Sequence, residues 1–539
     1  MTAILITLYV ICGAYMLLNF KRDIHAFQLN SYRISRYWRW LRHGNLMPAW
    51  RLTDVALIFL LLTPFMWVGL IAVPITLIVK SIMILTAKYK KPLAFTKRVI
   101  RLYCCTGIIA TALYAALTIL IVRGTIPLHL NAYFNETDSL APVVILLLMT
   151  TFSWAFVMLG AIVISPCEAA INRHYYNDAA RMLRSMPDMK IIGITGSYGK
   201  TSTKHYLQRI LSEKFEVLMT PGSFNTPMGV IRTVREMLKP YHEIFICEMG
   251  AKQTGDIKEI CDLVHPQMGI ITAVGPMHLE TFKSIENVQR TKFELADALP
   301  ADGLVVINND FPYSASREVE NVEAIRYGIS NTENVSYTVD NIVCTPEGTD
   351  FTVIGPNDLH LDLHTRLIGE SNLSNLTAAV IIALKLGVSH EQIRKSVEHI
   401  DQVEHRLSMK KTPAGVTIID DAYNSNPVGS RMAVEALGKF KDGRRIIITP
   451  GMIELGNRQY ELNKEFGKHI ARNVDIAIIV GEYNRKAISD GIKESNVLNE
   501  DSIYYVSTFM ESQQLLNSEL RMTKGDTVLY ENDLPDTFK

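Results

Sequence analysis

The sequence of 539 residues has almost no net charge and few cysteines. Its 55 Lys and Arg residues nearly balance its 54 Asp and Glu residues, so the formal net charge is only +1. Nucleic-acid-binding proteins usually carry a clear excess of basic residues, and we therefore expect no nucleic-acid partner. None of the seven cysteines forms a Cys-x-x-Cys pair, and most lie inside apolar runs. We interpret them as reduced thiols, which indicates a cytosolic environment for the soluble part of the chain.

The features of a cleavable signal peptide are also missing. Residues 4–18 are almost entirely apolar, but the basic residues Lys21 and Arg22 follow this run instead of preceding it. A signal peptide has its charges first and a small-residue cleavage site after the apolar core. We therefore interpret residues 4–18 as a membrane span that is retained.

Acidic residues are nearly absent from residues 21–53, where only Asp23 and the adjoining Asp54 occur among many basic and aromatic residues. This composition suits a segment that lies on the cytoplasmic face of a membrane. Further apolar runs occupy residues 55–86, 102–122 and 142–164, each at least near the ~20 residues that a bilayer requires. A buried helical domain of a soluble protein is the disfavoured alternative, because such a protein rarely contains several uncharged runs of this length.

The distribution of basic residues predicts the topology. The ligand-binding part after residue 166 is expected in the cytoplasm, so the last span runs inward and the span before it runs outward. The lysines and arginines between residues 88 and 98 then lie inside, as the positive-inside rule requires. Residues 55–86 could cross once, cross twice or re-enter. We favour a hairpin bent near Pro64–Pro74, because it keeps the basic segment 21–53 inside. The predicted location is the cell membrane, with several spans and the remaining domains in the cytoplasm.

Residues 189–203 carry the pattern of a phosphate-binding loop: an apolar strand, a glycine-spaced turn and a helix. Such a turn points backbone N–H groups at phosphate oxygens, Lys200 would reach the β- and γ-phosphates, and the Thr201 hydroxyl would bind Mg²⁺. The strict pattern places a glycine at Ile194, where there is none, so a chance match in an ordinary strand–turn–helix is the alternative. The candidate nucleotide-binding residues of the loop are Gly196, Ser197, Gly199, Lys200, Thr201 and Ser202.

Strand-like and helix-like runs alternate after this loop, which predicts a mainly parallel sheet with helices on both faces. Polar residues stand where ligands bind such sheets, at the ends of strands. Glu248 ends one strand and could hold Mg²⁺ or simply cap the next helix. His278 follows another strand through a Gly-Pro turn and could bind a metal or be structural. By sequence alone, Lys292 is a solvated lysine of a helix.

These patterns predict an α/β protein with four parts. They are an N-terminal helical transmembrane module (1–165), a connector helix (166–187), a central P-loop parallel-sheet ATPase domain (188–398) and a C-terminal Rossmann-like domain (399–539). A segment of alternating polarity, residues 335–366, predicts a β-insert in the central domain.

Seven segments resemble the motifs of the Mur ligase superfamily in order and approximate spacing. They are TGSYGKTSTK, CEMGAKQTGDI, AVGPMHLETF, RTKFELADAL, GESNLSNLTAA, HRL and IIDDAYNSNP, spread over about residues 188–530. The set is most similar to the branch that completes the peptidoglycan stem peptide, and IIDDAYNSNP differs from the folylpolyglutamate synthase branch. The resemblance implies an ATP-dependent ligase that joins a carboxylate to an amine through an acyl phosphate and releases ADP and phosphate.

The resemblance also implies roles for individual residues. Lys200 and Thr201 would hold the triphosphate and its Mg²⁺, with Glu248 as a further ligand. His278 would join a second Mg²⁺, and Lys292 matches a lysine that these enzymes carbamylate. Further contacts to ATP would come from Asn372, Asn375, Arg406 and Asp421. Residues expected near the substrate are Asn225, Tyr423, Asn424 and Asn426.

Two departures from the family concern substrate recognition. The helical module stands where the family has a UDP-sugar-binding domain, and residues 530–535 replace the usual Lys-Gly-Ser ending. We therefore expect a membrane-anchored ligase for a carboxylate and an amine of the cell envelope, with membrane proteins as possible partners. The alternatives are a ligase of the poly-γ-glutamate type and an ATPase component of an envelope transport or assembly machine. An inactive scaffold is disfavoured, because every metal and phosphate position is occupied by a suitable residue.

Overall fold

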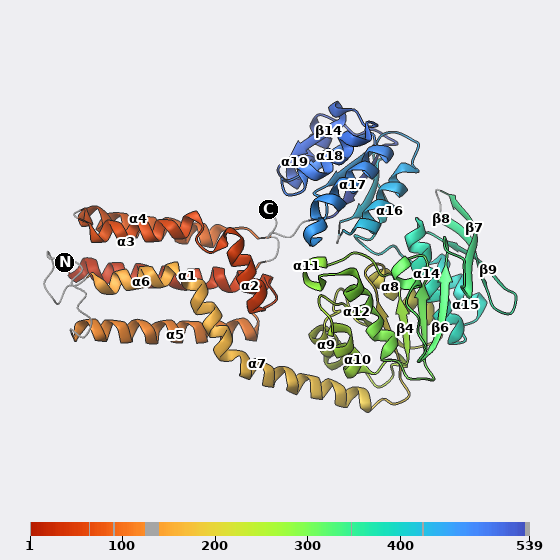
Figure 1. The fold of residues 1–539 in the computed structure, drawn as a ribbon, viewed down its shortest axis with the longest axis horizontal. Helices are drawn as coiled ribbons and strands as arrows, with labels where there is room; N and C mark the ends of the chain where they lie inside the picture. Colours follow the sequence, from red (N-terminus) through yellow and green to blue (C-terminus); the bar gives the residue numbers. More distant parts are fainter. Residues whose placement is uncertain are drawn as a thin grey trace. The chain divides into compact units, whose positions relative to one another are not determined.

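The computed structural model describes residues 2–63, 65–89, 92–123, 140–345, 348–422 and 425–533. The chain divides into two compact units, Met1–Arg173 and His174–Lys539. The first unit is helical, whereas the second is an α/β structure with two largely parallel sheets (Figure 1). The α/β class with parallel sheets is thus as predicted.

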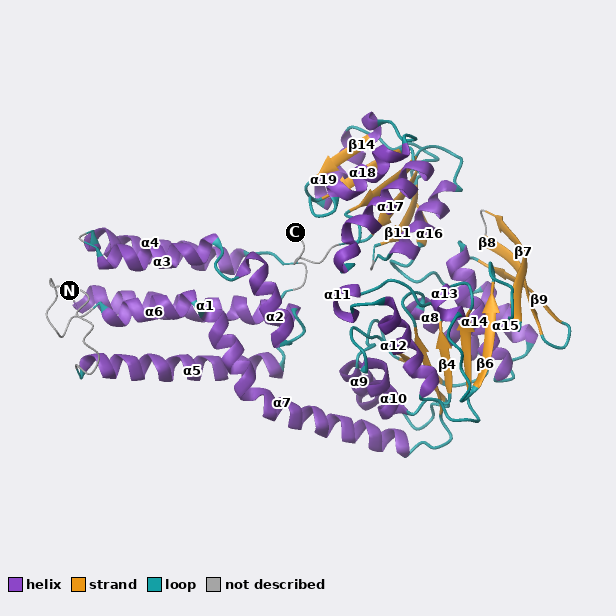
Figure 2. Ribbon diagram, in the orientation of Figure 1, coloured by secondary structure: helices purple, strands orange, loops and turns teal. Residues whose placement is uncertain are grey.

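Several helices of the first unit lie side by side in a bundle (Figures 1 and 2). By length and composition, four of its helices could cross a membrane, or five if the bent pair Ile34–Asn45 and Ala49–Leu62, which meet at 72°, forms one span; this count covers the described residues. The helices of this unit are α1 (Thr2–Leu29), α2 (Ile34–Trp40), a π-helical turn (Leu41–Asn45), α3 (Ala49–Leu62), α4 (Met66–Thr86), α5 (Lys97–Val122), α6 (Ala141–Thr151) and α7 (Ser153–Arg184), which continues into the second unit.

The apolar run 55–86 forms a helical hairpin of α3 and α4. The two helices approach closely, because a Cβ atom on Gly69 would lie 3.0 Å from Leu61 Cδ2. The structure thus agrees with the favoured hairpin; Pro64 itself is outside the described residues, and Pro74 lies within α4.

Three other features of the first unit differ from the predictions. Helix α1 continues to Leu29, so residues 21–29 of the basic segment 21–53 extend the apolar helix. The run 142–164 is broken at Phe152, where the Ser153 hydroxyl donates a hydrogen bond to Asp23 and α7 begins. Helix α7 then runs without interruption through residue 165, where a boundary to a separate connector was predicted. Polar residues with good helical propensity carry it on to Arg184.

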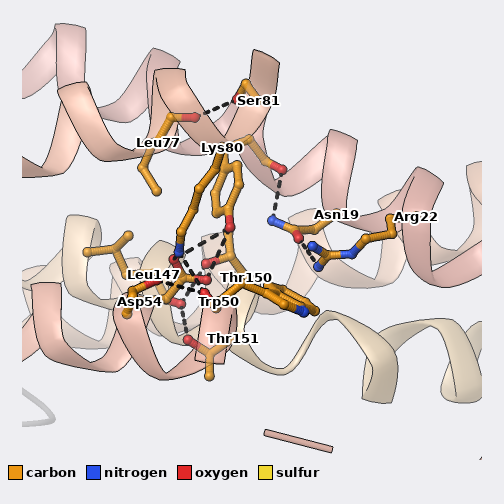
Figure 3. A network of polar contacts seen from close by, with 12 residues as sticks. Asn19, Arg22, Trp50, Asp54, Leu77, Lys80, Ser81, Leu147, Thr150 and Thr151 are labelled. Carbon is orange, nitrogen blue, oxygen red and sulfur yellow. Dashed lines mark hydrogen bonds and ion pairs between the residues drawn. The ribbon is translucent and has the colours of Figure 1, made fainter. Parts of the chain in front are cut away.

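Charged side chains are buried between the helices of the first unit, and they are paired. Arg51 of α3 and Asp23 of α1 form an ion pair at 2.8 Å, with side chains that are 1% and 3% exposed. Lys80 of α4 and Asp54 of α3 form a second pair at 2.5 Å, and the Tyr15 hydroxyl donates to Asp54 at 3.3 Å (Figure 3). A buried charge is tolerated only when it is paired and hydrogen-bonded. These pairs therefore connect α1, α3 and α4 in a specific register.

We expect Asp23→Leu to destabilise the first unit by about 3–5 kcal/mol, because it leaves Arg51 as an unpaired buried cation. The double variant Asp23→Leu/Arg51→Met should recover most of that loss. All five tryptophans belong to this unit, so tryptophan fluorescence during denaturation in detergent measures it selectively. Arg232→Met, which removes an exposed pair with Glu236 in the second unit, is the control and should have no effect. A double variant as unstable as the single one would contradict this account.

The second unit begins with a nine-stranded sheet in the order β2-β3-β1-β4-β5-β6-β7-β8-β9. All pairings from β2 to β7 in this order are parallel. The pairings of β7 with β8 and of β8 with β9 are antiparallel, and these three strands form the predicted β-insert. The strands are β1 (Lys190–Thr195), β2 (Val217–Met219), β3 (Ile244–Glu248), β4 (Met268–Ile271), β5 (Leu304–Asn308), β6 (Glu323–Gly328), β7 (Tyr337–Thr345), β8 (Gly348–Gly355) and β9 (Leu359–Thr365).

Helices cover both faces of this sheet (Figure 2). Successive residues of β1 point to opposite faces: Ile192 and Ile194 belong to one hydrophobic cluster and Ile191 to the other. The first cluster includes α8 (Lys200–Leu211), α14 (Glu370–Lys385) and α15 (His390–Glu398). The second includes α9 (Pro227–Met237), α10 (Asp256–Val264) and α12 (Ile285–Asp297). Short helices α11 (Leu279–Phe282) and α13 (Pro312–Ala315) lie in loops.

The rest of the second unit contains a six-stranded sheet in the order β10-β11-β15-β12-β13-β14, parallel except for β10. Its strands are β10 (Ser408–Lys411), β11 (Thr417–Asp421), β12 (Arg445–Thr449), β13 (Ile476–Val480), β14 (Ile503–Val506) and β15 (Thr527–Glu531). Its helices are α16 (Pro427–Gly438), α17 (Gln459–Asn473), α18 (Arg485–Ser495) and α19 (Phe509–Ser518), with the 3₁₀ turns Gly456–Arg458 and Glu500–Ser502. Doubly wound sheets of this kind bind ligands at the carboxyl ends of their strands.

Candidate functional site

The predicted phosphate loop connects β1 to α8. Strand β1 lies between β3, on the side of the sheet that ends in β2, and β4, on the side that continues to β9. The two glycines of the loop are required by close contacts. A Cβ on Gly196 would lie 2.1 Å from Thr272 Oγ1, and one on Gly199 would lie 2.1 Å from Asn375 Oδ1; Gly199 also has a φ of +77°. The loop can therefore turn tightly and present its N–H groups at the start of α8.

Hydroxyl groups fasten this loop to the segment that leads to His278. Ser197 Oγ donates to the Gly275 carbonyl at 3.0 Å and accepts from the Gly275 N–H at 3.1 Å. The Tyr198 hydroxyl donates to the Pro276 carbonyl at 3.0 Å. The Ser197 backbone N–H also donates to the Ala273 carbonyl, at 2.7 Å. Ser197 thus holds the loop in its turned geometry through both its side chain and its backbone.

Lys200 lies over the loop, where its ammonium donates to the carbonyls of Gly196 at 2.8 Å and Ser197 at 3.3 Å. Burial lowers the pKa of Lys200 to about 8, and the positive charge of Arg406 acts in the same direction, whereas Glu248 opposes them. An anionic phosphate beside Lys200 would raise this pKa again by stabilising the charged form, and it would take the place of the loop carbonyls.

Glu248 lies at the end of β3, next to the loop, and is 1% exposed. Its carboxylate accepts hydrogen bonds from Thr201 Oγ1 at 3.2 Å and from Asn225 Nδ2 at 3.0 Å, and it forms an ion pair with Lys204 at 2.9 Å. Burial raises the pKa of Glu248, but Lys204 and Lys200 outweigh it and hold that pKa below its ordinary value. The carboxylate is therefore ionised at neutral pH.

Thr201 and Glu248 fit a magnesium ion that is bound mainly through phosphate oxygens. Mg²⁺ prefers oxygen ligands and commonly takes only one or two from the protein. Among the described residues, no group of three or more His, Cys, Asp or Glu side chains could hold a metal by itself. The donor set present here would thus bind the ion together with a nucleotide.

His278 and Lys292 lie within electrostatic reach of each other and of this loop. The His278 ring is bonded through Nδ1 to the Glu454 carboxylate, which leaves Nε2 as the nitrogen for a metal. Lys292 is 2% exposed, and its ammonium has no carboxylate within ion-pair distance in the described part of the chain. Burial and the charge of Lys200 lower the pKa of Lys292 well below its ordinary value. The interpretation of Lys292 as a solvated lysine is therefore wrong.

The two asparagines of α14 have different environments. Asn375 packs against Gly199 of the phosphate loop, as a nucleotide contact would require. Asn372 accepts a hydrogen bond from the Tyr206 hydroxyl at 2.8 Å and donates to the Ile368 carbonyl at 2.9 Å. Asn372 thus holds α14 against α8, and its amide is already occupied. Ser202 is likewise buried, on the inner side of α8.

Arg406 and Asp421 come together near Lys200. Asp421 ends β11 and accepts a hydrogen bond from the Leu407 N–H at 3.0 Å. Burial raises the pKa of Asp421 to about 6, while the charge of Arg406 lowers it. The same arginine influences Lys200. The charge of Arg406, in the segment before β10, thus reaches both Asp421 at the end of β11 and Lys200 of the phosphate loop.

The predicted substrate residues are only partly described. Asn225 donates to Glu248, as above. Asn426 caps α16, because its Oδ1 accepts from the Gly429 N–H at 2.7 Å, so its side chain has a local structural role. Tyr423 and Asn424 lie outside the described residues.

Two buried charged residues of the site were not predicted. Lys204 follows Lys200 by one helical turn, and that spacing is the one signal in the sequence that could have indicated it. Glu531 ends β15 opposite Asp421 and is 1% exposed. It accepts hydrogen bonds from Ser425 and, at 2.8 Å, from Thr449. Glu531 thus joins the loop that follows β11 to the end of β12.

Glu531 should make the stability of the second unit depend on pH. Burial raises its pKa to about 7, with Asp421 acting in the same direction. The folded state holds this proton more tightly than the unfolded chain does. The contribution of Glu531 to the free energy of unfolding is therefore fully present below about pH 4.5 and is lost as the pH rises through 7. Glu531→Gln should remove this loss and raise the free energy of unfolding at pH 8 by up to about 3 kcal/mol. Denaturant titrations at pH 5 and pH 8 measure it, with the exposed Glu519→Gln as the control. Equal pH dependence in parent and Glu531→Gln would contradict the assignment.

Comparison with known proteins gives consistent results for the second unit. Residues 194–383 match the Mur ligase middle domain and residues 405–530 match the Mur ligase, glutamate ligase domain. The chain is 28% identical over 344 residues to the UDP-N-acetylmuramoyl-tripeptide--D-alanyl-D-alanine ligase of Bacillus subtilis, covering 63% of this chain and 72% of that protein. It is 27% identical to the Haemophilus influenzae enzyme of the same name, covering 67% and 80%.

A solved structure agrees. The crystal structure of MurF from Acinetobacter baumannii superposes with a TM-score of 0.60 at 26% identity, covering 67% of this chain and 77% of that one. The two domain matches follow each other in the order of the family and together span more than half of the sequence. The resemblance identified from the motifs is thereby confirmed: the chain belongs to the Mur ligase family of ATP-dependent enzymes that form amide bonds.

Proposed function

We propose that this protein is a membrane-anchored ligase that uses ATP to join a carboxylate and an amine of a cell-envelope precursor through an acyl phosphate. The observation that carries the proposal is the convergence of Lys200, Thr201 and Glu248 at the carboxyl ends of β1 and β3. This group offers a cation and a hydroxyl at the start of α8 and an ionised carboxylate at the end of β3, next to the phosphate loop. Such an arrangement suits a nucleoside triphosphate with its magnesium ion.

The residues of this chain would act in sequence. The loop N–H groups and Lys200 bind the triphosphate and orient the γ-phosphate toward the acceptor carboxylate. A carboxylate oxygen attacks the γ-phosphorus, ADP leaves, and the amine then attacks the acyl carbon with loss of phosphate. Magnesium would neutralise phosphate charge during the transfer. Thr201 and Glu248 would hold one ion, while His278 and a carbamylated Lys292 would supply ligands for a second.

The proposed substrates follow from the relatives. Their name specifies a UDP-N-acetylmuramoyl-tripeptide as the acid and D-alanyl-D-alanine as the amine. We infer a peptidoglycan-type peptide as the acid here as well. The matches lie in the second unit, so the helical residues 1–165 fall outside the part of the chain that these relatives share. A lipid-linked form of the acid would suit an enzyme that is held in the membrane.

We propose that residues 1–165 form a membrane module with the ligase domains on the cytoplasmic side. Four helices of suitable length and composition support it. Helix α2 and its π-helical turn meet α3 at 72° and carry cations at three-residue spacing, Arg33, Arg36, Arg39 and Arg42, without an acid. This suits a segment at a cytoplasmic interface. A reporter fused after Arg42 should give a cytoplasmic signal and one inserted at residue 131 an external one; an external signal after Arg42 would contradict the hairpin.

Transfer of an oxygen isotope tests the chemistry. The purified protein in detergent is supplied with ATP, Mg²⁺, D-alanyl-D-alanine and a UDP-linked tripeptide precursor whose acceptor carboxylate contains ¹⁸O. The proposal predicts one ¹⁸O atom in each phosphate released, because the attacking carboxylate oxygen remains on phosphorus when the amide forms. Phosphate without the label, or release that needs neither substrate, would instead support a mechanical ATPase.

A further inference from the structure

Lys204 is a completely buried cation with two polar partners. Its ammonium lies 2.9 Å from Glu248 Oε2 and donates to the Gly222 carbonyl at 2.7 Å. The exposed fractions of the Lys204 and Glu248 side chains are 0% and 2%. Removing a lysine ammonium from water is costly unless its charge is paired and its donors are used. Lys204 is therefore held in one place by the structure around it.

The two partners of Lys204 belong to different functional segments. Glu248 is the proposed magnesium ligand on β3. Gly222 lies in the loop 220–226 after β2, which also carries Asn225. Asn225 donates its side-chain amide to the other oxygen of Glu248 at 3.0 Å, and its carbonyl accepts from the Gly250 N–H at 2.7 Å. The helix of the phosphate loop, the carboxylate and the loop 220–226 thus meet at one ammonium group.

A second lysine competes for the same carboxylate. Lys200 also stabilises the ionised form of Glu248, although its ammonium now lies on carbonyls of the phosphate loop. A buried carboxylate without Lys204 would draw Lys200 toward itself, because no other cation pairs with Glu248 among the described residues. Lys200 would then be less available to a phosphate, and Glu248 less available to a metal.

We propose that Lys204 is a positioning residue, which keeps Glu248 directed at Thr201 and away from Lys200 and holds the loop 220–226 against it. The inference rests on the proposed function, since it concerns the magnesium and nucleotide of that site. Lys204 touches neither of them. It acts through Glu248, in the way that outer-shell groups fix metal ligands, whose loss typically reduces metal affinity about 10–100-fold.

The first test measures nucleotide binding to the full-length protein in detergent. Titrations with ADP are made in excess Mg²⁺ and in EDTA, and the ratio of the two affinities gives the gain due to the metal. Lys204→Met should reduce this gain about tenfold or more. Lys214→Met is the matched control, because Lys214 is also a lysine bonded to carbonyls, those of Leu386 and Gly387; it should retain the parental gain. An unchanged gain in Lys204→Met overturns the inference.

The second test asks whether Lys204 acts through Glu248. In a Glu248→Gln background, adding Lys204→Met should not change the metal gain further, whereas equal losses in both backgrounds would overturn the inference. This comparison also serves if Lys204→Met alone fails to fold, because the double variant buries no unpaired charge. Hydrogen exchange of residues 220–226 should be faster in the double variant than in Glu248→Gln, and unchanged exchange counts against the inference. A parent protein that binds no ADP would refute the proposed function instead.

Discussion

Lys292→Ala should reduce the rate of ligation by about 10²–10³-fold or more, because it removes the carbamate proposed to hold the second metal ion at the reacting phosphate. The buried position and the depressed pKa of Lys292 favour the neutral amine, which is the form that adds CO₂. A carbamate would convert this lysine into an anionic oxygen ligand beside His278. A short carboxylic acid added to the variant should then restore part of the rate by occupying the vacated space.

The control for this experiment is Lys258→Ala on α10, whose lysine is 64% exposed and pairs with Asp262. It should keep the parental rate and gain nothing from added acid. Native mass spectrometry of the parent should detect the added CO₂ on a peptide containing Lys292. Near-parental ligation in Lys292→Ala would contradict the two-metal assignment, as would a loss without rescue and without the carbamate.

Lys200→Ala should abolish measurable ATP turnover, with a loss of at least about 10³-fold, because the phosphate loop loses its one flexible cation. Extraction from membranes and tryptophan fluorescence should be unchanged, because all tryptophans lie in the first unit and Lys200 in the second. Lys190→Ala, at the exposed start of the same strand β1, is the control and should retain turnover. Equal turnover in Lys200→Ala and the parent would refute the phosphate-loop assignment.

Local sequence was sufficient to predict the phosphate loop and both parallel sheets. Gly196 and Gly199 mark the turn, because a tight loop that contacts Thr272 and Asn375 has no room for a Cβ. Apolar runs with polar residues at their ends likewise predict β1 and β3. Strands β6 and β10 were missed, since their charged and polar residues give them no continuous apolar run.

The buried charges of the site could not be predicted in the same way. Lys204 lies on α8 and Lys292 on α12. Whether each of them is exposed depends on the segments that pack over its helix, and these segments come from distant parts of the sequence. Lys204 meets Glu248 and Gly222, which lie 44 and 18 residues away in the chain. The helix break at Phe152 in the first unit also depends on a distant residue. Ser153, which follows the break, donates a hydrogen bond to Asp23 on α1.

The central claim is that this chain makes an amide bond at the expense of ATP. The most direct measurement is mass spectrometry of the products formed by the purified full-length protein with ATP, Mg²⁺, D-alanyl-D-alanine and either UDP-linked or lipid-linked muramoyl tripeptide. The account predicts a product equal to acid plus amine minus water, formed in equal amount with ADP and absent when either substrate is omitted. ADP formation without any such product, at a rate that the amine does not change, would contradict it.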